Sequence, residues 1–171
     1  MSDQDFDLAG ELALPALAMR IANPFVLWLG FELVRYEDGL AAIRFQPRPD
    51  HHNSFDVVHG GVCMTLLDVC MAYAGRSSNI TLGDAAPGLV TVEMKTLFLR
   101  PAEGLLLARA TLLHRTATMV FTEGRVLDAR GGLCAHATGT FKFVRKLPAT
   151  LGGLKEQTRI PTRKLDGPGS D

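Results

Sequence analysis

Short runs of apolar residues separated by turn residues cover most of this chain, and they predict β-strands. In residues 89–99 (LVTVEMKTLFL), alternate positions from Val90 to Phe98 fall on one side and those from Thr91 to Lys95 on the other, as in a half-buried strand. The predicted strands cover residues 31–36, 40–45, 89–99, 105–114, 117–127 and 133–144. Because the later strands follow one another through short turns, we expect an antiparallel meander.

One segment departs from this pattern. Residues 62–73 are almost wholly apolar and contain a single charge, Asp68. They leave no polar face, so we expect a helix enclosed by protein. At about fifteen residues it is shorter than the roughly 20 that cross a bilayer, so a buried core helix is favoured. Two strands, one buried helix and four strands predict an α+β fold, with an antiparallel sheet wrapped around one long central helix.

The start of this helix and its one charge are the first candidates for chemistry. Gly60 and Gly61, which follow His59, let another group approach the helix amides closely. Those amides lack intrahelical partners and suit a phosphate, a carboxylate or an oxyanion. A buried carboxylate such as Asp68 is costly unless it is paired, hydrogen-bonded or neutralised. Because Asp68 lies about 12 Å along the axis from Gly60, either it serves another purpose or a second copy supplies its own Asp68 to this helix start.

Composition narrows the class of protein. The 171 residues suit one domain, and the apolar content of 47% excludes general disorder. Eighteen basic residues balance eighteen acidic ones, so nothing points to nucleic acid. The acidic first residues lack the basic region of a secretory signal, and Cys63, Cys70 and Cys134 resemble reduced core residues. We therefore expect a cytoplasmic protein that does not insert into membranes.

The two ends of the chain differ from its middle. Residues 1–22 predict one or two short helical pieces, and residues 25–30 predict another. From residue 148 onward the chain is rich in Gly, Pro, Lys and Thr and has little apolar periodicity. The predicted organisation is an N-terminal helical extension (1–27), a central domain (28–145) and a flexible C-terminal tail (146–171).

Several stretches together resemble a known family. Asn53, five further residues, His59-Gly60-Gly61 and then Leu66-Leu67-Asp68 are similar to the signature of the hotdog-fold acyl-CoA thioesterases, closest to the phenylacetate-pathway (PaaI-like) branch. The run TVEMKTLFLRPAEG at 91–104 resembles the third strand and following turn of that branch, and ATGTF at 137–141 resembles its last strand. One departure is that the segment between Asn53 and His59 lacks the glycine expected in many relatives.

The resemblance implies a homodimer, or a homotetramer of back-to-back dimers, in which each active site takes its helix start from one subunit and its acid from the other. It implies that the Gly60 amide polarises the thioester carbonyl, and that His59 and Asn53 place the thioester and the attacking group. Asp68 of the other subunit would be the base or the nucleophile, and Thr91 would orient Asp68 or its water. The expected reaction is hydrolysis of an acyl-CoA thioester to a free acid and coenzyme A, without a metal or redox cofactor.

Further residues are candidates for binding the remaining parts of the substrate, the acyl group and coenzyme A. Gly61 joins Gly60 at the helix start as a substrate-binding residue, and Phe25 and Trp28 could line a tunnel for an apolar or aryl acyl group. Arg100 and Arg115 could meet the phosphates of coenzyme A.

Other interpretations were weighed. A metal site built from His51, His52, His59 and Asp68 is disfavoured, because adjacent histidines in an extended segment point to opposite sides. Cys63 lies inside the helix and is interpreted as a packing residue. Two other classes of function stay open: a non-catalytic acyl-CoA-binding module, which has no need of a buried charge, and a hotdog enoyl or hydroxyacyl thioester hydratase, whose catalytic motifs differ.

Overall fold

The computed structural model describes residues 6–19 and 23–144, with the backbone alone at 83–85. The predicted tail (146–171) and the first five residues lie outside the described part. Helices span Leu8–Ala13 (α1), Pro24–Leu29 (α2) and Gly60–Ser77 (α3). Strands span Phe31–Glu37 (β1), Leu40–Phe45 (β2), Gly88–Phe98 (β3), Leu106–Arg115 (β4), Met119–Asp128 (β5) and Leu133–Val144 (β6). Short 3₁₀ helices, Pro49–His51 and Ile80–Ala85, lie before and after α3.

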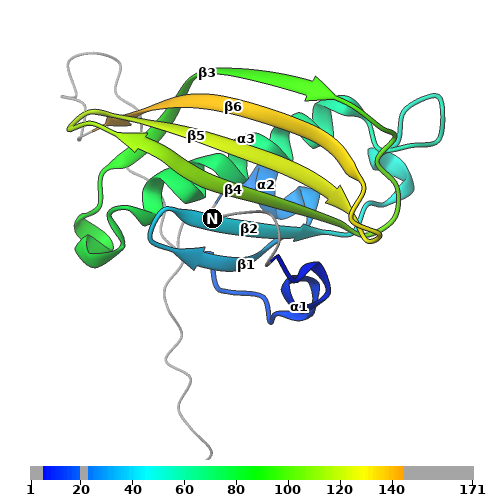
Figure 1. Ribbon diagram of the computed structural model, residues 1–171, viewed down its shortest axis with the longest axis horizontal. Helices are drawn as coiled ribbons and strands as arrows, with labels where there is room; N and C mark the ends of the chain where they lie inside the picture. The colour runs from blue at the N-terminus through cyan, green and yellow to red at the C-terminus, as the bar shows by residue number, and fades with distance from the viewer. Residues whose placement is uncertain (1–5, 20–22, 145–171) are drawn as a thin grey trace, which may run out of the picture.

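The six strands form one antiparallel sheet in the order β1-β2-β4-β5-β6-β3. The sheet curves around α3, which runs along its inner face (Figure 1). The predicted α+β fold, an antiparallel sheet wrapped around one long helix, is therefore confirmed. Within the described ranges, no helix is both long enough and apolar enough to cross a membrane.

The expected meander is wrong at one strand. β4, β5 and β6 are consecutive neighbours, but β3 pairs with β6, and β4 pairs with β2. The cause is the helix between β2 and β3: α3 has 18 residues and so extends about 27 Å. The chain leaves β2, follows α3 behind the sheet and begins β3 at the far edge. Apolar periodicity identifies a strand but does not identify its neighbour.

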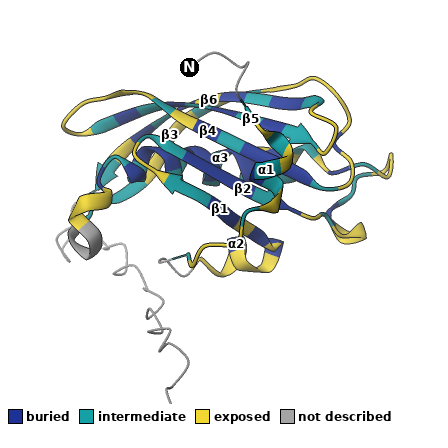
Figure 2. Ribbon diagram, turned by 60° about the horizontal axis from the view of Figure 1, so that its bottom comes forward, coloured by how far each residue is buried: buried dark blue, intermediate teal, exposed yellow. Residues whose placement is uncertain are grey.

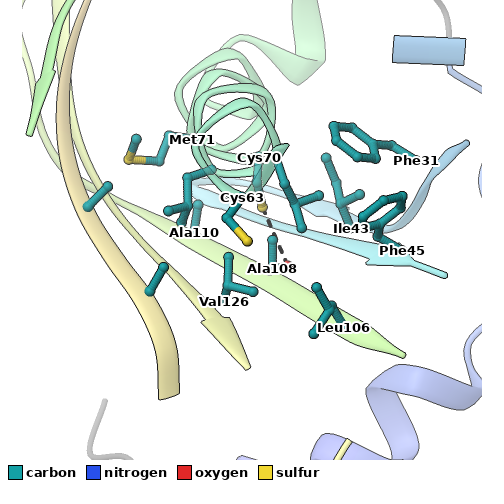
Figure 3. Close-up of a cluster of buried hydrophobic side chains, with 14 of the residues drawn as sticks. Phe31, Ile43, Phe45, Cys63, Cys70, Met71, Leu106, Ala108, Ala110 and Val126 are labelled. Carbon is teal, nitrogen blue, oxygen red and sulfur yellow. Dashed lines mark hydrogen bonds between the residues drawn. The ribbon is translucent and has the colours of Figure 1, made fainter. Parts of the chain in front are cut away.

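The core lies between α3 and the inner face of the sheet (Figure 3). Leu67, Cys70 and Met71 of α3 are fully buried there. Two glycines of the sheet make room for Met71: a Cβ at Gly124 would lie 3.0 Å from its Cγ, and a Cβ at Gly139 would lie 3.1 Å from its Cε. The absence of side chains on β5 and β6 at these points lets the helix pack close to the sheet.

The helix is not enclosed on all sides, contrary to the expectation from its apolar sequence. Gly61 and Met64 are exposed, and Thr65 and Asp68 are only partly buried. These four residues follow helical spacing and form what we call the open stripe of α3. Figure 2 shows α3 under the sheet, which covers its other side. An uncovered stripe along a helix that is otherwise packed in the core indicates that the fold of one chain leaves a contact surface here.

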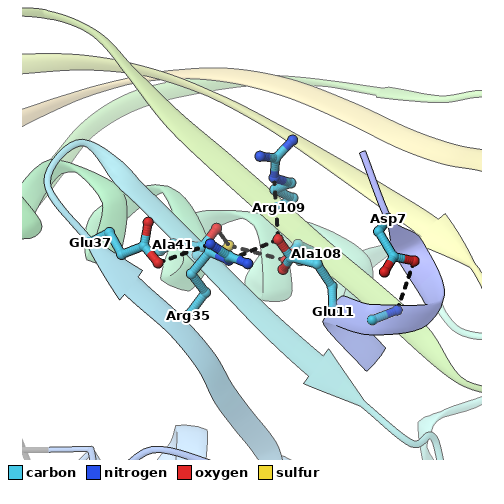
Figure 4. A network of polar contacts seen from close by, with 9 residues as sticks. Asp7, Glu11, Arg35, Glu37, Ala41, Ala108 and Arg109 are labelled. Atoms are coloured by element: carbon cyan, nitrogen blue, oxygen red, sulfur yellow. Dashed lines mark hydrogen bonds and ion pairs between the residues drawn. The ribbon is translucent and has the colours of Figure 1, made fainter. Parts of the chain in front are cut away.

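The N-terminal segment packs on the outer face of the sheet. Side chains from Phe6 to Leu14 contact a small buried cluster of Val34, Ala42 and Leu107. Glu11 of α1 is buried there, and its carboxylate lies 2.8 Å from the Nε atom of Arg35 (Figure 4). This segment therefore covers β1, β2 and β4 from outside.

The second short helix lies on the same side of the sheet as α3 (Figure 1). Asn23 caps its start by accepting a hydrogen bond from Val26 N, and Gly30, with φ of 80°, ends it. Val26 and Leu29 are buried in the main core, whereas Phe25 is exposed. The predicted domain boundary between residues 27 and 28 thus falls within α2.

Candidate active site

The start of α3 presents two hydrogen-bond donors. The Nδ1 atom of His59, the N-cap residue, accepts a hydrogen bond from Gly61 N at 2.9 Å. Because Nδ1 is an acceptor, the proton of the neutral ring resides on Nε2, which can donate. The amide of Gly60 has no acceptor among the described residues. A Cβ at Gly61 would lie 3.0 Å from His59 Nδ1, so a larger residue there would crowd the ring in this cap.

The loop before α3 is folded tightly. Asn53 N donates to Val57 O at 2.8 Å, and Asn53 Oδ1 accepts from Phe55 N at 2.8 Å. Asp56 has φ of 59°, the left-handed conformation that glycine adopts most easily and that Asp tolerates better than most residues. The segment thus makes a left-handed turn without a glycine. Asp56 also lies 2.9 Å from the ring nitrogen of His52.

The other polar part of the site joins α3 to β3. Thr91 Oγ1 donates to Asp68 Oδ1 at 2.7 Å. This contact depends on a bulge between Thr91 and Glu93, which inserts Val92 into the strand. The bulge places Thr91 and Met94 on the same, inner face, opposite inward-facing positions of β6. The simple alternation predicted for this strand, with Thr91 on the other side from Met94, is therefore wrong.

The charge of Asp68 is held in an unfavourable environment. Burial raises the pKa of its carboxyl above the ordinary value, and the hydrogen bond from Thr91 partly offsets this by stabilising the charged form. A raised pKa makes the carboxylate a better proton acceptor than a solvated one. The pair can therefore serve either as a general base or as a nucleophile.

Asp68 and Thr91 open into a pocket of about 370 Å³ between α2, α3 and β3. Its remaining walls are mainly apolar and come from Phe25, Val26, Met64, Val69 and Met94. A polar pair at one side of an apolar cavity suits a ligand with one reacting polar group and an apolar body.

The structure brings together some of the predicted site residues and separates others. Asp68 and Thr91 share the pocket with Phe25, while Trp28 lies beside it, with its ring stacked on that of Phe25 at 6.5 Å. His59, Gly60 and Gly61 lie at the start of α3, two helical turns from Asp68, so one chain does not unite the two groups. Asn53 lies in the loop that precedes this helix start.

The two candidate arginines lie at opposite ends of α3. Arg100 follows β3, whose last residue, Phe98, lies next to Gly60. Arg115 is instead bound to Ser78 O at 3.1 Å and to Asn79 Oδ1 at 2.7 Å, beyond the other end of the helix. The structure therefore does not bring Arg115 to the helix start.

Two alternatives weighed from the sequence are a nucleophilic Cys63 and a metal site. Cys63 is buried, and burial raises the pKa of its thiol to about 11, in agreement with a packing role. Within the described ranges, no three His, Cys, Asp or Glu side chains are placed to hold a metal ion.

Sequence reasoning missed most of the pocket wall. Met64 precedes Asp68 by one helical turn, and Thr65 precedes Val69 in the same way, so helical spacing could have identified these residues. Met94 could not be identified, because the bulge that turns it toward Thr91 has no sequence signal that we recognise.

Comparison with known proteins agrees with this picture. Residues 55–135 match the family model of the Thioesterase superfamily. A candidate esterase of Saccharolobus solfataricus is 27% identical over 125 residues, which cover 72% of this chain and 86% of the relative. The E. coli PaaI protein from the phenylacetic acid degradation operon superposes with a TM-score of 0.65 at 20% identity, over 72% of this chain and 86% of that one. A Bacillus halodurans protein solved with CoA gives a TM-score of 0.62 at 26% identity, over 72% and 77%.

The curved antiparallel sheet around one helix, shared with PaaI, defines a hotdog-fold protein. Within that class, residues 55–135 are similar to the Thioesterase superfamily. The resemblance seen in the sequence is thereby confirmed, and the family and its named relatives support thioester hydrolysis as the general reaction.

Proposed function

We propose that this protein hydrolyses an acyl-CoA thioester to a free carboxylic acid and coenzyme A. The observation that carries the proposal is the Asp68–Thr91 hydrogen bond of 2.7 Å at the side of an apolar pocket. Partial burial raises the pKa of this carboxylate, so its charged form destabilises the fold. A role in the reaction gives a reason for its presence. Coenzyme A as the thiol component is supported by the related Bacillus halodurans structure, which was solved with CoA.

The chemistry needs a donor and an attacking group on the same thioester. The Gly60 amide at the start of α3 would donate to the carbonyl oxygen as negative charge develops on it, assisted by the Nε2–H group of His59. Asp68 would either activate a water or attack the carbonyl carbon itself. In both cases the C–S bond breaks, coenzyme A leaves as its thiol, and water supplies the oxygen of the acid. The reaction requires no metal or redox step.

Because Gly60 and Asp68 are about 12 Å apart on one helix, the site would be shared between two copies. Two uncovered surfaces support this arrangement. The edge strand β3 exposes Val90, Val92 and Leu97, and the open stripe of α3 lies next to the pocket. A long apolar strand edge is a template for pairing with another chain. A homodimer joined at β3 would leave for a tetramer the part of the outer face that the N-terminal segment does not cover.

The direct test is thiol release from short, medium, long and aryl acyl-CoAs by the wild type and by Asp68→Asn. We expect the variant to lose at least about a hundredfold in kcat while it still binds substrate, because Asp68 acts on the chemical step. Binding without turnover by both proteins would favour an acyl-CoA-binding module instead. Hydration of an enoyl-CoA without thiol release would indicate the hydratase class.

The same variant provides its own control for folding. The folded-state pKa of Asp68 lies above its unfolded value, so the ionised carboxylate destabilises the fold at neutral pH. We expect Asp68→Asn to be at least as stable as the wild type in thermal unfolding at neutral pH. Its advantage should shrink as the pH falls through the raised pKa, where Asp68 of the folded wild type becomes protonated. A variant that is less stable at neutral pH would contradict this assignment.

A further inference from the structure

Phe55 is the most exposed large apolar side chain of the described residues, with 83% of its surface in solvent. It lies in the loop between Asn53 and His59, where its own amide donates to Asn53 Oδ1 and where Asn53 N closes the turn to Val57 O. A ring held in water on an ordered loop contributes nothing to the stability of a single chain. We therefore look for a contact between Phe55 and another molecule.

The pocket beside Asp68 lacks cover on one side. Phe25 and Met64 both line it, yet they are 55% and 43% exposed. The two side chains belong to α2 and to the open stripe of α3, so the uncovered wall faces the surface where a second copy would lie.

The proposed function connects these two features. It requires Gly60 of one copy to reach the thioester at Asp68 of the other. Phe55 is five residues before Gly60 and so lies within about 18 Å of it even for an extended chain. The hydrogen-bonded turn at Asn53 makes the actual distance shorter. If Gly60 reaches that thioester, the loop that carries Phe55 comes within this distance of the pocket of the other copy.

Resting on the proposed function, we propose that Phe55 of one copy closes the acyl pocket of the other copy, against Phe25 and Met64. The acyl group then lies between apolar side chains of both copies. Such a pocket selects acyl groups that are apolar and large enough to touch the ring, either aryl or medium-chain, over acetyl. Phe55 is thus a specificity residue acting in trans.

The first experiment measures kcat/KM for acetyl-, hexanoyl-, decanoyl- and phenylacetyl-CoA with Phe55→Ala. Loss of one apolar pocket contact is expected to lower kcat/KM for the best large substrate by about tenfold and to leave acetyl-CoA almost unchanged. Leu113→Ala is the matched control, because Leu113 is also well exposed but lies on β4, and it should leave the ratio unaltered. An unchanged ratio in Phe55→Ala would overturn the proposal.

The second experiment tests action in trans, with differently tagged Asp68→Asn and Phe55→Ala chains purified as hybrid dimers. If Phe55 serves the other copy, the one active site combines intact Asp68 from one chain with intact Phe55 from its partner. The hybrid then shows the wild-type preference for large acyl groups. A hybrid with the Phe55→Ala preference would mean that Phe55 serves its own chain and would refute the proposal. A wild type that hydrolyses none of the four substrates would instead overturn the proposed function itself.

Discussion

At the scale of single residues, the proposed site depends on how one carboxylate is kept charged. Asp68 has a single described hydrogen-bond donor, Thr91, and burial on α3 opposes its ionisation. Thr91 therefore does more than fill a strand position: its hydroxyl favours the form of Asp68 that can accept a proton. At the other end of the site, the ring of His59 is oriented by its own helix cap.

Thr91→Val should move the acid limb of the pH–kcat/KM profile to higher pH. The substitution removes the hydrogen bond to the charged form, so the pKa of Asp68 rises further. The loss of rate should be largest at acidic pH and shrink as the pH is raised. Thr91→Ser, which keeps the hydroxyl, should retain the wild-type profile. A loss that is the same at every pH would show that Thr91 only positions Asp68 or its water.

At the scale of elements, a hydrogen-bond network joins the end of α3 to the turn of the β1–β2 hairpin. Ser77, in the last turn of α3, is fully buried, and its Oγ donates to Ala74 O at 2.7 Å. The same oxygen accepts from Gly39 N, in the hairpin turn, at 2.8 Å. Gly39 adopts φ of 75°, which glycine allows without strain. The hairpin and the far end of the helix are thus fixed to each other.

Ser77→Ala should destabilise the fold by about 1–3 kcal/mol, because it leaves the Gly39 amide without its partner. The measure is the free energy of unfolding in urea. Ser78→Ala is a matched control: the Oγ of Ser78 also donates to a carbonyl three residues earlier, at 2.7 Å, but the described hydrogen bonds give this Oγ no long-range partner. Equal losses in the two variants would show that the Gly39 contact adds nothing.

At the scale of the whole molecule, one chain does not cover its own helix α3 on all sides. The sheet covers one side of α3, and the open stripe and the edge of β3 stay uncovered on the other. Both surfaces lie beside the pocket, so the proposed association would bury apolar area and complete the site at the same time.

Val92→Lys should convert the proposed dimer to monomer and abolish most thioesterase activity. Val92 is 56% exposed near the middle of β3, and lysine on a strand edge opposes pairing. Leu113→Lys places the same charge at a 57% exposed position on β4, away from that edge, and should leave both properties unaltered. Sedimentation velocity with parallel activity measurements would decide. A fully active Val92→Lys monomer would refute a shared site.

The sequence alone determined the local elements and the two polar centres of the site. Strands and helices follow from apolar periodicity and from turn residues, which act over a few positions, so the bounds of the six strands, α2 and α3 were predicted within a few residues. Gly60 and Asp68 stood out because each is unusual for a buried apolar helix. Their spacing along the helix also showed that one chain could not bring them together.

The tertiary structure decided what depends on contacts between distant segments. These features are the pairing of β3 with β6, the bulge at Val92 that turns Thr91 toward Asp68, and the uncovered stripe of α3. The same physical reason explains why periodicity does not predict any of the three. Which strand lies beside which, and which side of a helix stays uncovered, depends on where the whole chain runs in space, whereas periodicity records only whether a residue prefers apolar surroundings.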